Sequence, residues 1–229
     1  MEVLKAQDFK DKWEIIFIDD ASTDSTRKII EEIELTNFKS YFLMKNSGQS
    51  AARNLGLSKA KGEYIYMIDV DDQLSKDSLS KLYTVAKKNN LDIVFSDFQR
   101  IEHSENQRKE KFNYSSDKFF DYNDITLAMF NELSDTSLGH LGLFGCNGRL
   151  IKRSILIKNK ILFEEKLRLM EDKIFGWNVL SVCKNASYIR EQLYSYYVYP
   201  EKNTALTDSL NFGFNLDTVK LIVMHVSEC

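Results

Sequence analysis

Proline, glycine and cysteine are all scarce in this chain of 229 residues. It has one proline and nine glycines, a composition that excludes collagen-like proteins and proline-rich linkers. Its three cysteines form no CxxC pair, so the sequence indicates no disulfide framework, and we expect reduced thiols in an intracellular protein. These cysteines are Cys146, Cys183 and Cys229.

A dominant charge sign and a long apolar run are also missing. The 31 basic and 34 acidic residues leave a net charge of −3, which gives no electrostatic footprint for general nucleic-acid binding. The longest apolar runs, 15–18 and 64–68, are far shorter than the roughly 20 residues that cross a bilayer, and no signal peptide is visible. With 43% hydrophobic residues, the chain can bury the core of one large domain or two small ones.

Short apolar runs alternate with helix-like stretches in the first hundred residues. Four strands are predicted, at 13–18, 41–44, 64–68 and 92–98. Helices are predicted between them, at 25–34, at 49–60 and around 79–86. Alternation of this length indicates βαβ units and a mostly parallel α/β sheet.

The pattern becomes less regular after residue 98. The polar residues 102–118 predict a solvated loop. Further helices are predicted at 121–131, 149–158 and 171–182, and strands at 186–189 and 193–199. The last stretch has apolar residues at helical spacing and predicts a packed helix; they are Leu216, Val219, Val223 and Val226.

Polar residues follow three of the predicted strands, at the point where each strand ends. The clusters are residues 19–24 (DDASTD), residues 46–54, which begin Asn46-Ser47-Gly48-Gln49, and residues 69–72 (DVDD). Ligands of open parallel sheets bind at the carboxyl ends of the strands. We therefore expect the three clusters to converge on one site at that edge.

Asp69 and Asp71 are the strongest candidates for metal ligands in these clusters. If the backbone is extended there, their carboxylates share one side while Val70 turns into the sheet. Mg²⁺ and Mn²⁺ prefer oxygen ligands and bridge carboxylates to phosphates, so the expected ligand is a metal-bound diphosphate. The competing interpretation is that Asp71 or Asp72 only caps the following helix.

The other polar residues each have a functional and a structural interpretation. Asp19 or Asp20 could accept hydrogen bonds from a base or ribose, or the cluster could only cap the next helix through Ser22 or Asp24. Arg53, one turn into a helix, could reach a diphosphate or be an ordinary surface charge.

Three further features of the sequence bear on its chemistry. The pair Glu171-Asp172 fits a helix start through the helix dipole, or could supply a base. His103, His140 and His225 have no metal-ligand spacing. Neither a P-loop nor a GxGxxG motif is present.

These motifs resemble the GT-A-fold glycosyltransferases of family 2, which build bacterial polysaccharides from nucleotide-sugars. Residues 13–24 resemble the family's strand and DDGSTD turn, residues 46–54 (NSGQSAARN) its NxGxxxARN segment, and residues 69–72 its DxDD motif. Asn147–Arg153, with Phe163, Glu171 and Asp172, resemble the family's acceptor-half stretch NKLYKR…F…ED. Residues 193–197 resemble its LYYY strand. The motifs follow the family's order over most of the chain.

The resemblance implies a Rossmann-like GT-A fold, a mostly parallel sheet flanked by helices with an α+β acceptor-side portion. Residues 1–100 would be the donor-binding half and residues 101–229 the acceptor half of one domain. It implies an inverting transfer from a nucleotide-sugar, with a UDP-sugar expected, to a glycan or polyprenyl-linked acceptor. It also implies a cytoplasmic location, with peripheral contact at the inner face of the membrane as an open alternative.

The resemblance also assigns roles to particular residues. Asp20 would recognise the base and Arg53 would help to bind the nucleotide, in a nucleotide-sugar site that includes Asp19, Asn46 and Gly48. Asp69 and Asp71 would hold the ribose and a Mn²⁺ or Mg²⁺ ion on the diphosphate. Asp172 would be the general base, with Glu171 as the second candidate.

The sequence departs from the family pattern in the acceptor half and at its start. Gly148 stands where the family has lysine, and Val198-Tyr199 replace an arginine or histidine. The family's central first strand has no counterpart before residue 13, and its loss would leave two rows of backbone groups unpaired. We therefore expect a truncated, poorly stable and weakly active chain, or direct pairing of the strands that end at Ile18 and Ile68.

Two other functions remain open at this point. A non-catalytic nucleotide-sugar-binding or partner subunit would keep the DxD motif without turnover, and donor hydrolysis with and without Mn²⁺ separates it from an enzyme. A nucleotidyltransferase is a third alternative, which the mass of the product would distinguish. The identity of the sugar depends on pocket contacts that the sequence does not specify.

Overall fold

The computed structural model describes residues 2–102, 107–110, 116–134, 142–198 and 218–224. They form a ten-stranded sheet in the order β2-β1-β10-β3-β8-β5-β9-β4, with β6 beside β5 and β7 beside β9. The strands are β1 Trp13–Asp19, β2 Phe38–Phe42, β3 Tyr64–Asp69, β4 Gln73–Leu74, β5 Ile93–Glu102, β6 Gln107–Glu110, β7 Lys118–Asp121, β8 Arg149–Lys152, β9 Asn185–Val198 and β10 Thr218–Met224. The helices are α1 Glu2–Lys5, α2 Thr26–Glu31, α3 Gln49–Lys59, α4 Ser78–Asn89, α5 Tyr122–Ser134, α6 Arg153–Asn159 and α7 Glu171–Leu180, with a 3-10 turn at Gly142–Phe144.

The strands that alternate with helices all run in one direction, as the sequence predicted. β1 pairs in parallel with β2, and β5 pairs in parallel with β9. Between β1, β3 and β5 the sheet contains two strands of opposite direction, β10 and β8, and each is antiparallel to both of its neighbours. The α/β class is confirmed, with a mixed sheet in place of continuous parallel pairing.

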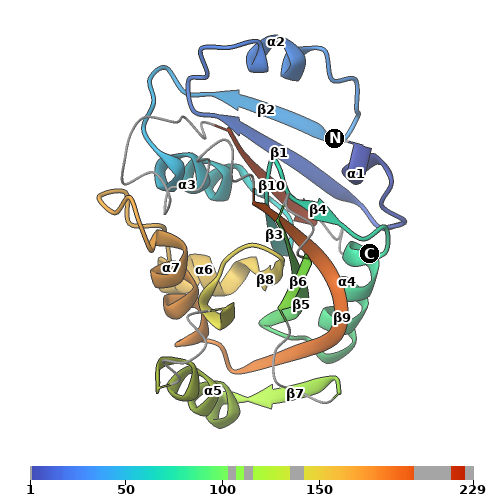
Figure 1. The fold of residues 1–229 in the computed structure, drawn as a ribbon, viewed down its shortest axis with the longest axis vertical. Coiled ribbons are helices and arrows are strands. Elements are labelled where there is room, and N and C mark those ends of the chain that lie inside the picture. Colours follow the sequence, from blue (N-terminus) through green and yellow to red (C-terminus); the bar gives the residue numbers. More distant parts are fainter. Residues whose placement is uncertain (1, 103–106, 111–115, 135–141, 199–217, 225–229) are drawn as a thin grey trace.

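Helices cover both faces of this sheet (Figure 1). Alternate residues along a strand face opposite sides, so Ile15 joins one apolar core cluster while Ile16 joins the other. The cluster around Ile16 includes buried residues of α3, α5, α6 and α7, and the cluster around Ile15 includes those of α4. Polar residues lie at the carboxyl ends of β1 and β3, between the two helical layers.

β10 occupies the place between β1 and β3. Its first residue, Thr218, pairs with Asp19, the last residue of β1. Its second residue, Val219, pairs with Asp69, the last residue of β3. The prediction of a helix at this point was wrong, because a short run rich in β-branched residues fits a buried strand as well as a helix. The expected direct pairing of the strands ending at Ile18 and Ile68 is also absent, since β10 satisfies both rows of backbone groups.

Three other predicted elements differ from the structure. The helix predicted at 149–158 begins with strand β8, which pairs with both β3 and β5. The loop predicted at 102–118 contains β6, paired with β5. The two strands predicted at 186–189 and 193–199 are one strand, β9, whose register with β5 shifts at Ser96 and Asp97.

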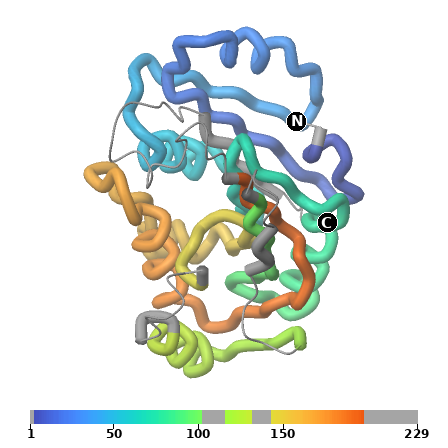
Figure 2. The backbone as a smooth tube through the Cα atoms, viewed as in Figure 1, coloured from blue at the N-terminus to red at the C-terminus, as the bar shows by residue number. Residues whose placement is uncertain are grey.

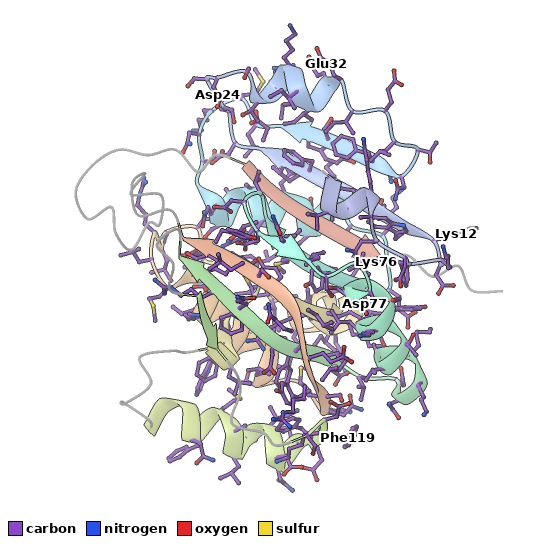
Figure 3. All side chains as sticks on the ribbon, turned by 45° about the vertical axis from the view of Figure 1, so that its right-hand side comes forward. Lys12, Asp24, Glu32, Lys76, Asp77 and Phe119 are labelled. Carbon is purple, nitrogen blue, oxygen red and sulfur yellow. The ribbon has the colours of Figure 1, made fainter. Side chains whose placement is uncertain are left out.

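The two ends of the molecule hold different parts of the chain. Figure 2 shows the first sixty residues at one end and α5 with β7 at the other. The segment before β1 lies against the residues that lead into α4. The Asp8 N–H donates to the Lys76 carbonyl at 3.0 Å. Lys76 and Asp77 are labelled in Figure 3.

The remaining sequence predictions concern thiols, histidines and membrane spans. Cys146 and Cys183 are free and buried, whereas Cys229 and the three histidines lie outside the described residues. Among the helices in the described part of the chain, none combines the length and apolar character that crossing a bilayer requires.

Candidate functional site

The carboxyl ends of β1, β2 and β3 lie at one edge of the sheet, because these three strands share a direction. Asp19 is the last residue of β1 and Asp69 the last residue of β3. Asp19 pairs with Thr218 and Asp69 pairs with Val219, the first two residues of β10. Only one strand therefore separates the two aspartates. The edge therefore brings two of the predicted polar clusters close to each other.

Asp20 joins the first cluster to the second. Its carboxylate accepts hydrogen bonds from the backbone N–H groups of Ser47 at 2.7 Å and Gly48 at 2.6 Å. Asp19 and Asp20 are both buried, and the Asp19 carboxylate accepts from the Ser22 N–H at 3.3 Å and from its hydroxyl. The two acids thus shape the loops around the edge, and contact with a base or ribose remains a prediction for them.

Gly48 is the N-cap residue directly before helix α3. Its φ of +88° places it in a backbone region that residues with a side chain rarely adopt, and space around it is open. The positive φ at this position therefore favours glycine, whereas neighbouring atoms would leave room for a side chain. Asn46 lies two residues earlier, exposed in the loop that Asp20 holds.

Arg53 is buried, so its interpretation as an ordinary surface charge was wrong. Its guanidinium donates to Glu171 Oε1 at 3.0 Å and to Asp69 Oδ1 at 3.3 Å, and it lies over the ring of Phe163 at 5.2 Å. Burial alone lowers the pKa of Arg53, but the acidic groups around it raise the pKa above its ordinary value. Arg53 therefore joins the end of β3 to the start of α7 as a permanent cation.

Asn147 is a site residue to which the sequence analysis assigned no role, although it opens the motif at Asn147–Arg153. Its side-chain amide donates to Asp69 Oδ2 at 2.6 Å, so Arg53 and Asn147 hold the two oxygens of one carboxylate. Asn147 stands directly before Gly148, whose φ is +71°. The signal in the sequence was this asparagine–glycine pair at the start of the acceptor-half motif.

The DxD motif forms a turn and not a continuation of β3. The Asp72 N–H donates to the Asp69 carbonyl at 3.2 Å, and Val70 is 41% exposed. The prediction that Val70 turns into the sheet was therefore wrong, because the strand ends at Asp69. The capping alternative for Asp71 or Asp72 is wrong too, since the next helix begins at Ser78 after the N-cap residue Asp77.

Asp72 is buried directly beside this turn. Its carboxylate accepts from the Tyr194 hydroxyl and from the Tyr197 N–H at 3.2 Å. Burial, together with the charge of Asp69, raises the pKa of Asp72 to about 8. Burial also raises the pKa of Tyr194 well above its ordinary value, so both partners of this pair are shielded from water.

Glu171 and Asp172 open helix α7 with different surroundings. The Glu171 side chain is 10% exposed and bonded to Arg53, whereas the Asp172 side chain is 32% exposed and lies 3.5 Å from the Lys173 ammonium. Met170, before them, has a φ of +66°. The two carboxylates that the sequence could not separate therefore differ in what they can reach.

Asp69 and Asp71 carry carboxylate oxygens, the ligand type that Mg²⁺ and Mn²⁺ prefer. Within the described ranges no group of three histidine, cysteine or acidic side chains is placed to hold a metal ion. This arrangement fits an ion held by one or two carboxylates and completed by phosphate oxygens of a substrate. It does not fit an all-protein metal cage.

A hollow of about 920 Å³ lies at the other edge of the sheet, by the first residues of β1 and β2. Its lining includes Leu4, Trp13 and Lys39, and none of the predicted site residues. Glu14 in its wall is paired with Lys39 at 2.6 Å. The chemistry indicated by the sequence is therefore at the carboxyl ends of the strands and not in this hollow.

Comparison with known proteins identifies the family of the chain. The family model "Glycosyl transferase family 2" matches residues 2–158. The chain belongs to glycosyltransferase family 2. Among curated relatives of this family 2 chain, the cholesterol galactosyltransferase of Borreliella burgdorferi is 30% identical over 194 residues, covering 82% of the chain and 52% of the relative. The poly(ribitol-phosphate) beta-N-acetylglucosaminyltransferase TarP of Staphylococcus aureus is 31% identical over 201 residues, covering 86% of the chain and 55% of the relative.

Solved structures show the same fold. S. aureus TarS in complex with UDP-GlcNAc superposes with a TM-score of 0.72 at 21% identity, covering 90% of the family 2 chain and 55% of the TarS chain. TarS in complex with UDP gives a TM-score of 0.69 at 21% identity, covering 94% and 62%. The family 2 chain thus spans about half the length of the curated relatives that it matches.

Proposed function

We propose that this chain transfers a sugar from a UDP-sugar to a hydroxyl group of a glycan or lipid-linked acceptor, with inversion at the anomeric carbon. Its family membership supports sugar transfer, and the UDP and UDP-GlcNAc held by TarS support the donor class. The names of its relatives, which act on a sterol or on poly(ribitol-phosphate), support an acceptor of a glycan or lipid-linked type.

The observation that carries the proposal is the difference in burial and bonding between Glu171 and Asp172. Glu171 is tied to the Arg53 guanidinium at 3.0 Å and is buried. Asp172 is the more open carboxylate, on the same first turn of α7. In an inverting transfer a carboxylate within hydrogen-bond reach of the acceptor hydroxyl removes its proton as the new bond forms. Asp172 is the residue that can take this role.

Asp69 and Asp71 would hold a Mn²⁺ or Mg²⁺ ion on the donor diphosphate. When bound, such an ion neutralises the charge that develops on the departing nucleoside diphosphate. Arg53 and Asn147 fix the Asp69 carboxylate at the end of β3. Asp19, Asp20, Asn46 and Gly48 form the neighbouring loops, in which we place the nucleoside.

Replacement of the base tests the assignment. Asp172→Asn keeps the size of the side chain but removes the proton acceptor, so UDP binding should persist while sugar transfer falls by roughly 10²–10⁴-fold. Glu171→Gln is the matched variant, and it should mainly lower stability because it weakens the bond to Arg53. Transfer by Asp172→Asn at the wild-type rate would contradict the assignment.

The competing function is a non-catalytic subunit that binds nucleotide-sugars. Such a protein would bind UDP-sugar but release no free sugar from it, with or without Mn²⁺. Slow donor hydrolysis that depends on Mn²⁺ and on Asp172 would favour the enzyme. Mass analysis of the product separates sugar transfer from nucleotide transfer.

A further inference from the structure

The turn that carries Asp69 and Asp71 is fastened to a strand from the other half of the chain. Directly after the turn, the short strand β4 pairs antiparallel with β9, Gln73 with Ser195 and Leu74 with Tyr194. Asp72, the last residue of the turn, directs its carboxylate at β9 as well. It accepts two hydrogen bonds from β9, one from a side chain and one from the backbone.

A carboxylate is a costly residue at this position. Asp72 is only 4% exposed, and burying a charge next to Asp69 and Asp71 adds repulsion to desolvation. An apolar side chain would pack a turn against a strand without that cost. A carboxylate instead fixes both position and orientation, because two donors on β9 must meet its two oxygens.

Tyr194 touches a second part of the same site. A Cβ atom on Gly148 would lie 3.0 Å from the Tyr194 ring, so the ring lies directly against this residue. The preceding residue, Asn147, donates to the Asp69 carboxylate at 2.6 Å. Tyr194 thus contacts the Asp69–Asp72 turn through its hydroxyl and the segment that holds Asp69 through its ring.

We propose that Asp72 and Tyr194 are positioning residues for the metal–diphosphate site. Through the bond between them, β9 sets the place of Asp69 and Asp71 relative to the acceptor half. Neither residue touches the reacting atoms. The inference rests on the proposed function, since it concerns the affinity for a metal-bound nucleotide.

Deletion of one hydroxyl group tests this role, with a matched control on the same strand. Tyr194→Phe removes the hydroxyl that bonds Asp72. Tyr188→Phe removes the hydroxyl of β9 that bonds Asp97 of β5 at 2.6 Å, which is also a buried tyrosine–aspartate pair. Calorimetry would measure UDP affinity with Mn²⁺ and with EDTA, and a thermal melt would measure stability.

Tyr194→Phe should weaken Mn²⁺-dependent UDP affinity by up to about 10-fold, the size expected for one lost hydrogen bond. Affinity in EDTA should change little. Tyr188→Phe should lower the melting temperature but keep the Mn²⁺-dependent affinity. Asp72→Asn should weaken that affinity too, and the double variant with Tyr194→Phe should be no weaker than the weaker single variant.

The outcomes separate this inference from the proposed function. If the wild type shows no Mn²⁺-dependent UDP binding, the proposed function and the inference both fail. If the wild type binds and Tyr194→Phe binds equally well, only the inference fails. Equal losses of affinity in Tyr194→Phe and Tyr188→Phe would also overturn it, because a general loss of stability would then explain both.

Discussion

At the scale of single residues, the site is organised by carboxylates that differ in what they contact. Asp20 and Asp72 are buried and accept bonds that shape loops. Asp69 is held by Arg53 and Asn147 at the end of a strand. Asp71 lies half-buried in the following turn. These surroundings, and not the residue type, decide what each acid can contact.

Asp71→Ala tests the metal assignment. The residue lies in a turn at the sheet edge and outside the apolar core, so its loss should abolish Mn²⁺-dependent UDP binding and leave the fold intact. Calorimetry with UDP and Mn²⁺ measures the first effect, and circular dichroism checks the second. Undiminished Mn²⁺-dependent affinity would show that Asp71 is not a ligand.

Arg53 offers a test of the bond between the two halves. Arg53→Ala leaves Glu171 buried without its cation, and breaking a buried pair in this way costs about 3–5 kcal/mol of unfolding free energy. Arg53→Lys should cost less, because a lysine keeps the charge but loses the forked geometry. Urea denaturation measures both.

A matched arginine shows what an exposed pair contributes. Arg27 bonds Glu31 at 3.0 Å on the surface of α2, and Arg27→Ala should cost no more than about 1 kcal/mol. If Arg53→Ala is as mild as Arg27→Ala, the Arg53–Glu171 bond does not hold the halves together.

At the scale of elements, helix α7 is placed by one close approach. A Cβ atom on Gly176 would lie 1.8 Å from the carbonyl oxygen of Phe144. Phe163 and Phe175 stack beside it with ring centroids 4.0 Å apart, and the Phe163 backbone is bonded in both directions by Asn54. The helix that begins with Glu171 and Asp172 is therefore seated on segments from both halves.

Gly176→Ala should be strongly destabilising although alanine favours helices. The added methyl group must push α7 from the backbone at Phe144, and overpacking of this kind costs about 1–3 kcal/mol or more. Asn178→Ala, at an exposed position of the same helix, should be neutral or slightly stabilising through helix propensity. Thermal or urea denaturation compares the pair, and equal stability of the two variants would contradict the close approach.

At the scale of the whole molecule, β10 joins the two sides of the sheet. It pairs along seven residues with β1 and along six with β3. A strand paired on both sides uses every backbone group in its ladders, so a proline anywhere in it removes a hydrogen bond and disturbs its neighbours.

Leu221→Pro should therefore loosen the centre of the sheet. Leu221 pairs with Ile16 of β1 and Met67 of β3. Hydrogen exchange should show lost protection in β1 and β3, and stability should fall by about 3 kcal/mol or more. Leu221→Val, which keeps the backbone N–H and suits a strand, is the control. Unchanged protection of β1 and β3 in Leu221→Pro would show that β10 does not hold them together.

Local patterns predicted β1, α3, β3 and α4 closely, because each is an apolar run followed by a polar cluster or a clear helical face. They failed at β8 and β10, where short apolar runs fit a helix or a strand equally well. Which of the two forms depends on whether unpaired strand edges lie nearby, and no local window of sequence contains that information.

The sequence by itself determined the family, the α/β class and the clusters of polar residues at the ends of β1, β2 and β3. It did so because motif order and hydrophobic period are properties of the chain. The tertiary structure decided that Arg53 is buried, that Glu171 rather than Asp172 takes it as a partner, and that Asp72 faces Tyr194. These outcomes depend on contacts between residues about 120 positions apart, and burial and pairing at such separations arise only when the sheet and its helices have packed.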